Sequence, residues 1–245
     1  TGVPEKRMIK TYVECTGIVE VPPGYVYAVH SPVRGFVGPV NQLAGDNVRK
    51  GSLLTTIRHQ DLIKLQQDFL EQHIQLDLLE KDLERKKTLA EADATSQMAR
   101  EEVEAAYATA KIRLAALRSE LQLIGLDPDQ LAESGEVKKE LPIYAPITCK
   151  LNTVAVNRGR LVNSEDLLYE ILDVRHIHLE LKVFAKDIPL IKEGQDIEIS
   201  VSGQNRLIAA EVHRVGPMIN PELKTALVHG HLKNEQERLF PGAYV

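Results

Sequence analysis

The clearest pattern along the chain is helical and covers residues 61–124, a stretch with neither Gly nor Pro that is rich in strong helix formers. Its apolar positions alternate three- and four-residue spacings, which is the pattern of a coiled-coil seam. The first part of the seam contains Leu62, Leu65, Phe69, Leu76, Leu79 and Leu83, and the second part contains Val103, Tyr107, Ala110, Leu114, Leu117, Leu121 and Ile124.

The seam lapses between these two parts. Continued beyond Leu83, it falls on Asp93, Gln97, Arg100 and Glu104. One unbroken helix would hold its ends roughly 96 Å apart, whereas a hairpin has two arms of about 45 Å and brings its ends together. We therefore predict a hairpin, with Gly125 and Pro128 ending the returning arm. On its heptads alone, the segment also fits a coiled coil used for dimerisation.

An internal repeat flanks the helical segment, because residues 28–57 align without gaps on residues 142–171 at an offset of 114. One copy has too few apolar residues for a core, so we expect the two copies to pack face to face in a single β-sandwich. Only a hairpin lets them meet. Seven of the thirty positions are identical: Pro32/Pro146, Val40/Val154, Gly45/Gly159, Val48/Val162, Leu53/Leu167, Leu54/Leu168 and Ile57/Ile171.

From residue 177 the pattern changes to strict alternation, with Ile177, Leu179, Leu181 and Val183 on one face and His178, Glu180 and Lys182 on the other. Further strands are predicted at 196–202, 207–215 and 225–233, with at most a brief helix within 185–192. The N-terminal stretch 7–21 is able to pair into the same sheet. These segments predict a small antiparallel barrel of about six strands.

Composition narrows the possible functions. The net charge is −5, so the chain lacks the basic field that drives binding to nucleic acid. Cys15 and Cys149 are far apart and form no C-x-x-C motif, which favours two buried small side chains over a zinc knuckle or a disulfide framework. No apolar run approaches 18 residues, so neither a membrane span nor a signal peptide is predicted. We expect the natural protein to include a leader or anchor and to continue beyond Val245.

Several runs resemble one family. Residues 31–37 (SPVRGFV), 45–51 (GDNVRKG) and the pair Leu53-Leu54 resemble the first lipoyl half-motif of membrane fusion proteins, the periplasmic adaptors of resistance-nodulation-division efflux pumps. Residues 123–126 (LIGL), 145–147 (API), 172–174 (LDV) and 239–242 (LFPG) resemble the heavy-metal-efflux branch, in the same order along the chain. Cys149 and Ala210 stand where the family commonly has Gly, and Ala243 stands where the branch favours Met. These departures weaken an assignment to metal transport.

The resemblance implies a mixed α and β, elongated, multi-domain protein: a lipoyl-like β-sandwich split by a long α-helical coiled-coil hairpin, plus a small antiparallel β-barrel. Residues 1–24 are N-terminal strands that join the barrel, or a fragment of a membrane-proximal domain. The remaining boundaries are 25–58 for the lipoyl-like first half, 59–124 for the hairpin, 125–173 for a linker and the lipoyl-like second half, and 174–245 for the barrel.

The implied function is that of a non-catalytic periplasmic adaptor that links an inner-membrane efflux transporter to an outer-membrane channel in a tripartite export complex. The adaptor forms a homo-oligomeric ring in the periplasm of a Gram-negative bacterium and is anchored to the inner membrane by a segment absent from this chain. Alternatives are a metal-binding chaperone that feeds the pump, or an adaptor of an ABC-type exporter. The exported substrate, a metal ion or an organic compound, stays open.

The resemblance also suggests site residues. Arg85, Ala92 and Ser96 have the spacing of a channel-contacting motif at the hairpin tip, with Ala92 in place of the family's Leu. Carrier domains of this type present a modified Lys at the turn between their halves, and here the helical insert replaces that turn. We therefore expect no cofactor, including no covalent lipoyl or biotin. Structural turns are assigned to Gly35, Gly45, Gly159 and Gly242.

Two histidine pairs are the remaining candidates for chemistry. His176 with His178, and His229 with His231, have strand spacing and could supply imidazole ligands to zinc or copper. Ordinary exposed strand histidines are the favoured interpretation, so no metal site is assigned. The three methionines, Met8, Met98 and Met218, are scattered, which disfavours a thioether site for Cu(I). No catalytic signature is found, and the chain is predicted not to be an enzyme.

Overall fold

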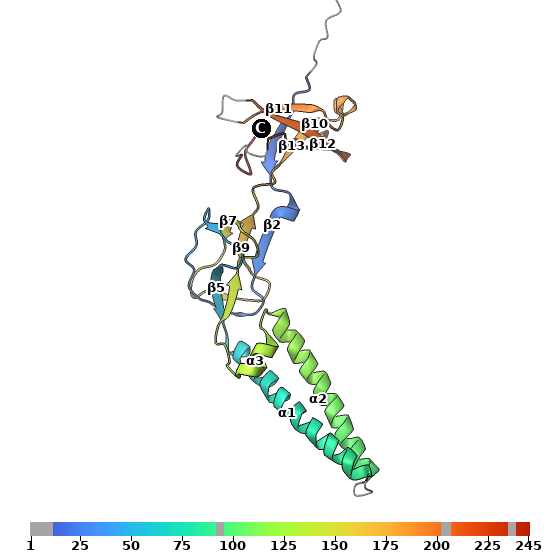
Figure 1. Ribbon diagram of the computed structural model, residues 1–245. Helices are drawn as coiled ribbons and strands as arrows, with labels where there is room; N and C mark the ends of the chain where they lie inside the picture. The colour runs from blue at the N-terminus through green and yellow to red at the C-terminus, as the bar shows by residue number, and fades with distance from the viewer. Residues whose placement is uncertain (1–11, 92–95, 202–206, 235–238) are drawn as a thin grey trace, which may run out of the picture. The chain divides into compact units, whose positions relative to one another are not determined.

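The computed structural model describes residues 12–91, 96–201, 207–234 and 239–245 (Figure 1). The chain divides into two compact units. One unit contains residues 28–170, with both copies of the repeat and the helical segment between them. The other contains the residues up to 27 and those from 171 onward.

The helical segment forms the predicted hairpin, with α1 over Gln60–Glu91 and α2 over Gln97–Leu123 lying side by side (Figure 1). Every residue of the predicted seam is buried or half-buried. Gln72, a polar exception in the seam, is half-buried and donates from Nε2 to the carbonyl oxygen of Ala110 on the other arm at 3.4 Å. The sequence therefore located both the seam and the reversal.

The returning arm ends as predicted, at a glycine. Gly125 has φ of 84°, and its N–H donates to the carbonyl of Gln122, while the N–H of Leu126 donates to that of Leu121. This pair of bonds is the Schellman motif, which satisfies carbonyls left without partners at a helix end. The next helix, α3 over Pro128–Ser134, lies in the region predicted as a linker and is capped by Asp127.

A buried glutamine fastens the base of the hairpin. Gln66 is only 1% exposed. Its Nε2 donates to the carbonyls of Leu62 and Lys138, at 2.8 and 2.9 Å, and its Oε1 accepts from the N–H of Lys138 at 2.8 Å. A buried amide is stable only when its polar atoms are paired, so these bonds connect α1 to the segment that enters the second copy of the repeat.

The repeat forms two four-stranded sheets. In one the order is β2 (Val26–His30), β9 (Leu167–Leu172), β7 (Cys149–Val154) and β4 (Asn47–Val48). In the other it is β6 (Leu141–Tyr144), β5 (Leu53–Arg58), β3 (Gly35–Val37) and β8 (Leu161–Val162). Each sheet therefore contains two strands from each copy, so the copies exchange strands rather than each forming one sheet.

The hydrogen bonds between the two copies are reciprocal. The N–H of Gly45 donates to the carbonyl of Leu151, and the N–H of Gly159 donates to that of Val37, each at 2.8 Å. Strand register repeats the relation: Gly35 lies opposite Val162, and Val48 lies opposite Cys149. Positions 35 and 149, 37 and 151, 45 and 159, and 48 and 162 all differ by 114, so the two copies are related by approximate two-fold symmetry.

The second unit is built on one antiparallel sheet in the order β1 (Thr16–Glu20), β10 (His178–Phe184), β13 (Thr225–Leu232), β12 (Leu207–Asn220) and β11 (Asp196–Ser200). The described residues thus form five strands, not six. The free edge of β1 pairs instead with the C-terminal residues, where Gly17 and Val245 exchange two N–H to carbonyl bonds of 2.8 and 2.9 Å. Two short 3₁₀ turns, Pro23–Tyr25 and Ile188–Leu190, complete the unit, and the latter is the predicted brief helix.

The alternation predicted for this sheet is confirmed. Its inner face forms one apolar core, which includes Val19, Leu179, Leu181, Val183, Ile199, Ile208, Val212 and Val228. The outer face is mostly polar, with Phe184, Leu207 and Leu227 as exposed apolar exceptions. Successive side chains of a strand point to opposite faces of the sheet. A residue that adjoins a core residue along the strand therefore faces outward.

Candidate functional site

The hairpin tip holds the predicted partner-contact residues. Ala92 lies outside the described residues. Arg85 is exposed on α1 and its guanidinium lies 3.9 Å from the Asp82 carboxylate, a spacing that contributes little at a solvated surface. Ser96 is exposed, and its Oγ accepts from the N–H of Ala99 as the N-cap of α2. The structure therefore assigns Ser96 a capping role, and contact with a partner stays a prediction.

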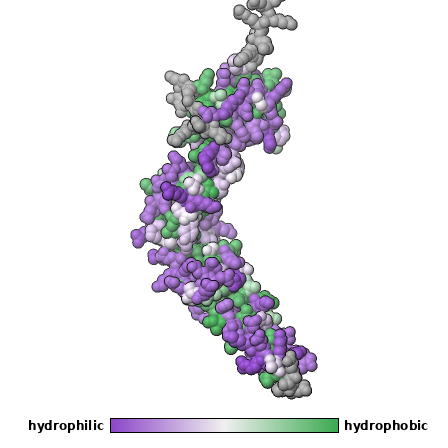
Figure 2. Space-filling model, in the orientation of Figure 1, coloured by the Kyte–Doolittle hydropathy of each residue, from purple (hydrophilic) through white to green (hydrophobic). Residues whose placement is uncertain are grey.

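A second apolar stripe lies on α1, away from the seam. Ile63, Ile74, Leu78 and Leu89 are all exposed, Ile74 by 68%. At about 100° per residue these four positions fall within about 80° of the helix circumference, roughly opposite the seam. Apolar surface interrupts the polar surface of the hairpin (Figure 2). Gln67, Glu71 and Lys81 fall in the same sector, so the stripe is a row of separate exposed apolar side chains that a partner could cover.

Three of the four predicted turn glycines have the backbone that only glycine adopts easily: φ is 94° at Gly45, 83° at Gly159 and 86° at Gly242. Gly35 is different, because it lies within strand β3 rather than at a turn. A Cβ there would lie 2.6 Å from Cγ2 of Ile57 and 2.8 Å from the carbonyl oxygen of Arg58. Close strand packing, not a turn, requires glycine at this position.

The predicted histidine pairs are rearranged by the fold. His178 contacts His231, with ring centroids 4.2 Å apart, rather than His176, whose ring contacts Tyr25 at 4.4 Å. His213, which the sequence did not single out, stacks on His231 at 4.0 Å. Alternation along residues 207–215 could have placed His213 on the outer face of the sheet. It could not have shown which histidines lie beside it, because that depends on the order of the strands.

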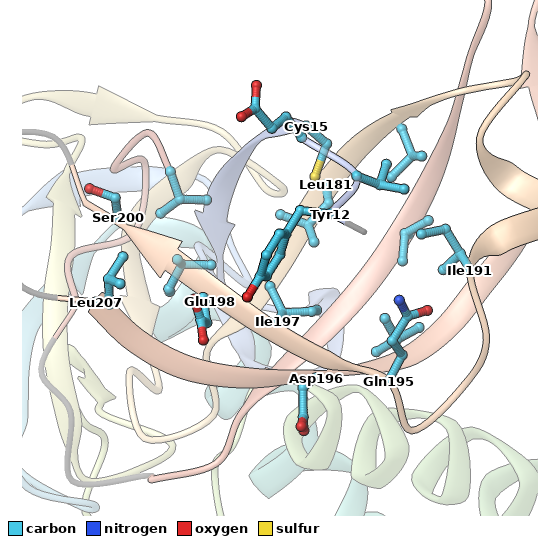
Figure 3. Close-up of a pocket in the computed structure, with 17 residues that line it drawn as sticks. Tyr12, Cys15, Leu181, Ile191, Gln195, Asp196, Ile197, Glu198, Ser200 and Leu207 are labelled. Carbon is cyan, nitrogen blue, oxygen red and sulfur yellow. The ribbon is translucent and has the colours of Figure 1, made fainter. Parts of the chain in front are cut away.

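A pocket opens within the second unit between the segment before β1 and strand β11 (Figure 3). Its lining is mainly aliphatic and includes Leu181, Ile191 and Ile197. Cys15 also lines it, and burial raises the pKa of that thiol, so the reactive thiolate is disfavoured. The pocket continues the apolar core to the open side of the sheet, and its geometry indicates no nucleophile.

The C-terminal part of the chain matches a family model. Residues 176–245 match the model described as the CusB-like β-barrel domain. The matched segment contains strands β10 to β13 of the barrel sheet. Among the described residues, no helix is both long and apolar enough to cross a membrane.

Individual relatives and solved structures are also similar to the chain. The chain is 23% identical over 211 residues to the cobalt-zinc-cadmium resistance protein CzcB of Cupriavidus metallidurans, covering 86% of this chain and 40% of that protein. ZneB of Cupriavidus metallidurans has a similar fold, with a TM-score of 0.63, 21% identity and 94% coverage of both chains. A MacA–MexA chimera containing the Pseudomonas aeruginosa MexA α-hairpin gives a TM-score of 0.67 and 20% identity, over 94% of this chain and 77% of that one. The chain thus spans well under half the length of its curated relative.

Proposed function

We propose that this chain is the body of a non-catalytic periplasmic adaptor that links an inner-membrane efflux transporter to an outer-membrane channel. The order of its parts carries the proposal: two copies of a repeat exchange strands, a long hairpin leaves from between them, and a CusB-like β-barrel domain follows. The whole-chain fold similarity to ZneB and to the MacA–MexA chimera supports it.

In the proposed adaptor, the hairpin is the part that extends toward the outer-membrane channel. Arms of 32 and 27 residues extend about 40–48 Å from the two sheets. The apolar stripe of Ile63, Ile74, Leu78 and Leu89 is the proposed lateral contact with a different face of the neighbouring copy, because a head-to-tail contact repeated from copy to copy closes a ring. The tip, with Arg85 and Ser96, is the proposed channel contact.

The two exchanged sheets are, in this proposal, the lipoyl-like sandwich, with halves at 25–58 and 125–173. They have lost the carrier function, because the turn that would present a modified Lys is replaced by the hairpin between β5 and β6. Intact-mass measurement of the protein purified from its own cells should therefore show no lipoyl or biotin increment. We place the protein in the periplasm of a Gram-negative bacterium, anchored to the inner membrane by a segment outside this chain.

Photo-crosslinking in living cells tests the adaptor role. A photoreactive amino acid is placed, one position at a time, at Ser96 near the tip, at Leu78 in the stripe, and at Lys192, an exposed control position in the second unit. We expect position 96 to crosslink to an outer-membrane channel protein and position 78 to a second copy of the chain. Position 192 should crosslink to neither.

The outcomes separate the parts of the proposal. Crosslinks from position 96 that match those from position 192, with no outer-membrane protein among them, would overturn the adaptor role. A channel crosslink at 96 without a self-crosslink at 78 would overturn the lateral contact alone. Partners are identified by mass spectrometry, and an inner-membrane transporter of the ABC class among them would replace the resistance-nodulation-division pump as the partner.

A further inference from the structure

The outer face of the barrel sheet contains a row of ionisable residues that crosses all five strands. Strand register places Glu20 opposite His178, His178 opposite His231, His231 opposite Glu211, and Glu211 opposite Asp196. Their sequence neighbours Val19, Leu179 and Val212 are core residues, so the row itself faces outward. Two histidines therefore lie at the centre of the row, flanked by carboxylates on both sides.

A β-bulge adds a third histidine to this centre. The register of β12 against β13 shifts between Val212 and Arg214, so His213 is the extra residue at that point. Its ring stacks on His231 with centroids 4.0 Å apart and planes 15° apart, and it lies 6.4 Å from the ring of His178. Three imidazoles from three adjacent strands thus lie within 6.4 Å of one another.

Two of the three imidazoles, those of His178 and His231, favour the neutral form that binds metals. Burial, followed by the neighbouring imidazoles of His231 and His213, lowers the pKa of His178 to about 4. Burial and His213 also lower the pKa of His231, against the opposing effect of Glu211. The rings of His178 and His231 therefore each have a nitrogen lone pair available at neutral pH.

One ring nitrogen in the cluster has no partner. Nε2 of His231 is buried, and it makes no hydrogen bond with any residue that the structure describes. Buried polar atoms are nearly always paired, and an unpaired one indicates a missing water or ion. The row also places the carboxylate of Glu211 directly opposite His231, where it would attract a cation.

We propose that His178, His213 and His231 bind one divalent transition-metal ion of the zinc class, with Glu211 or water as the fourth ligand. Three imidazoles with one further oxygen ligand suit zinc and its neighbours, and the absence of sulfur from this set disfavours Cu(I). In the described residues no three such side chains already converge on one point, so the stacked rings rotate when the ion binds. His213 is exposed and His178 is half-buried, which leaves both rings room to turn.

Metal binding at this site does not depend on the proposed adaptor role, because every ligand belongs to the barrel sheet and none to the hairpin. Its failure and the failure of channel binding are therefore distinguishable. The proposed ligands match neither of the two histidine pairs that the sequence suggested. They take His178 from one pair and His231 from the other, and they add His213.

Titration of the tag-free chain with Zn(II), followed by calorimetry, tests the site, and Co(II) provides a visible-absorption signature of its geometry. We expect one ion per chain. The variants His178→Ala, His213→Ala and His231→Ala should each weaken binding by at least ~10-fold, because loss of a direct ligand costs no less than loss of an outer-shell partner. His73→Ala is the matched control, because His73 is exposed on α1 and should leave binding unchanged.

Circular dichroism of each variant shows whether it is folded. If His231→Ala fails to fold, His213→Asn keeps the test intact, because His213 is exposed and its ring is not part of the core. Saturation at one Zn(II) per chain that is lost in the cluster variants and kept in His73→Ala supports the proposal. No binding of either metal, or equal affinity in the wild-type chain and in His213→Asn, overturns it.

Discussion

The two copies of the repeat share a backbone, although most of their side chains differ. At the second turn of each copy, Gly51 and Glu165 occupy equivalent positions with φ of 78° and 77°. Both donate their N–H to the other copy, Gly51 to Ala145 and Glu165 to Ser31. Glutamate rarely adopts this backbone, whereas glycine does so readily. Bonds to the opposite copy therefore impose the turn even where the local residue disfavours it.

Buried positions of the two copies also combine equivalent backbone with different side chains. Thr55 and Tyr169 are equivalent, and both are buried. The Tyr169 hydroxyl crosses to the first copy and donates to the carbonyl of Leu54 at 3.1 Å, whereas Thr55 donates to Pro39 within its own copy. Approximate symmetry of the backbone thus tolerates unlike side chains where the two copies meet. Comparing equivalent substitutions shows how far that symmetry extends to energetics.

The largest effects are expected at equivalent core leucines. Leu54 and Leu168 are 2% and 0% exposed, so truncation to Ala leaves a cavity in either copy. Leu54→Ala and Leu168→Ala should each lower the free energy of unfolding by about 2–5 kcal/mol, and by similar amounts. Hydrogen exchange measured on residues 28–170 isolates this unit from the barrel sheet. Clearly unequal losses would show that the symmetry of the backbone does not extend to packing.

Next in size is the contrast between Gly35 and Cys149, which face Val162 and Val48 in matching register. Gly35→Ala should destabilise the unit by about 1–3 kcal/mol, because the new Cβ would clash with the backbone of Arg58. The reverse change, Cys149→Gly, introduces no clash and should cost about 1 kcal/mol, mainly through the backbone freedom that glycine adds to a strand. Urea unfolding of both variants measures the contrast, and equal costs would contradict it.

The buried tyrosine makes the comparison depend on pH. Burial raises the pKa of Tyr169 to about 12, against about 10 in an unfolded chain. The unfolded chain therefore loses this proton first, and the stability due to the neutral phenol is present below pH 10 and is lost as pH rises toward 12. Tyr169→Phe should cost about 1 kcal/mol at pH 7 through the lost hydrogen bond. It should also flatten the decline above pH 10 relative to the wild-type chain, whereas Tyr144→Phe, at an exposed position, should not.

The smallest effect is expected at the strained turn. Glu165→Gly should stabilise the unit by up to about 1 kcal/mol, because relief of the left-handed backbone exceeds the entropy that glycine adds to the unfolded chain. Gly51→Ala should destabilise it by a comparable amount, through backbone conformation alone, since a Cβ there would meet no other atom within 4 Å. Thermal melts of the two variants should shift in opposite directions. A loss of stability in Glu165→Gly would mean that the Glu165 side chain itself contributes.

Sequence alone determined which residues face inward and where the chain reverses. The heptad seam, its lapse, and the glycine after residue 124 predicted α1, α2 and the stop between α2 and α3, because helical periodicity and caps are local properties. Alternation likewise predicted the inner face of the barrel sheet. The repeat predicted that two distant segments assemble together, and strands from both copies do share each sheet.

Only the tertiary structure decided which strands are neighbours. Alternation with a period of two assigns a residue to a face but says nothing about the strand beside it, since pairing depends on contacts across more than a hundred residues. For this reason the exchange of strands between the copies, the close approach at Gly35 and the approach of His213 to His231 were beyond sequence analysis. A single-residue bulge brings the third imidazole into place, and no local pattern in the sequence marks it.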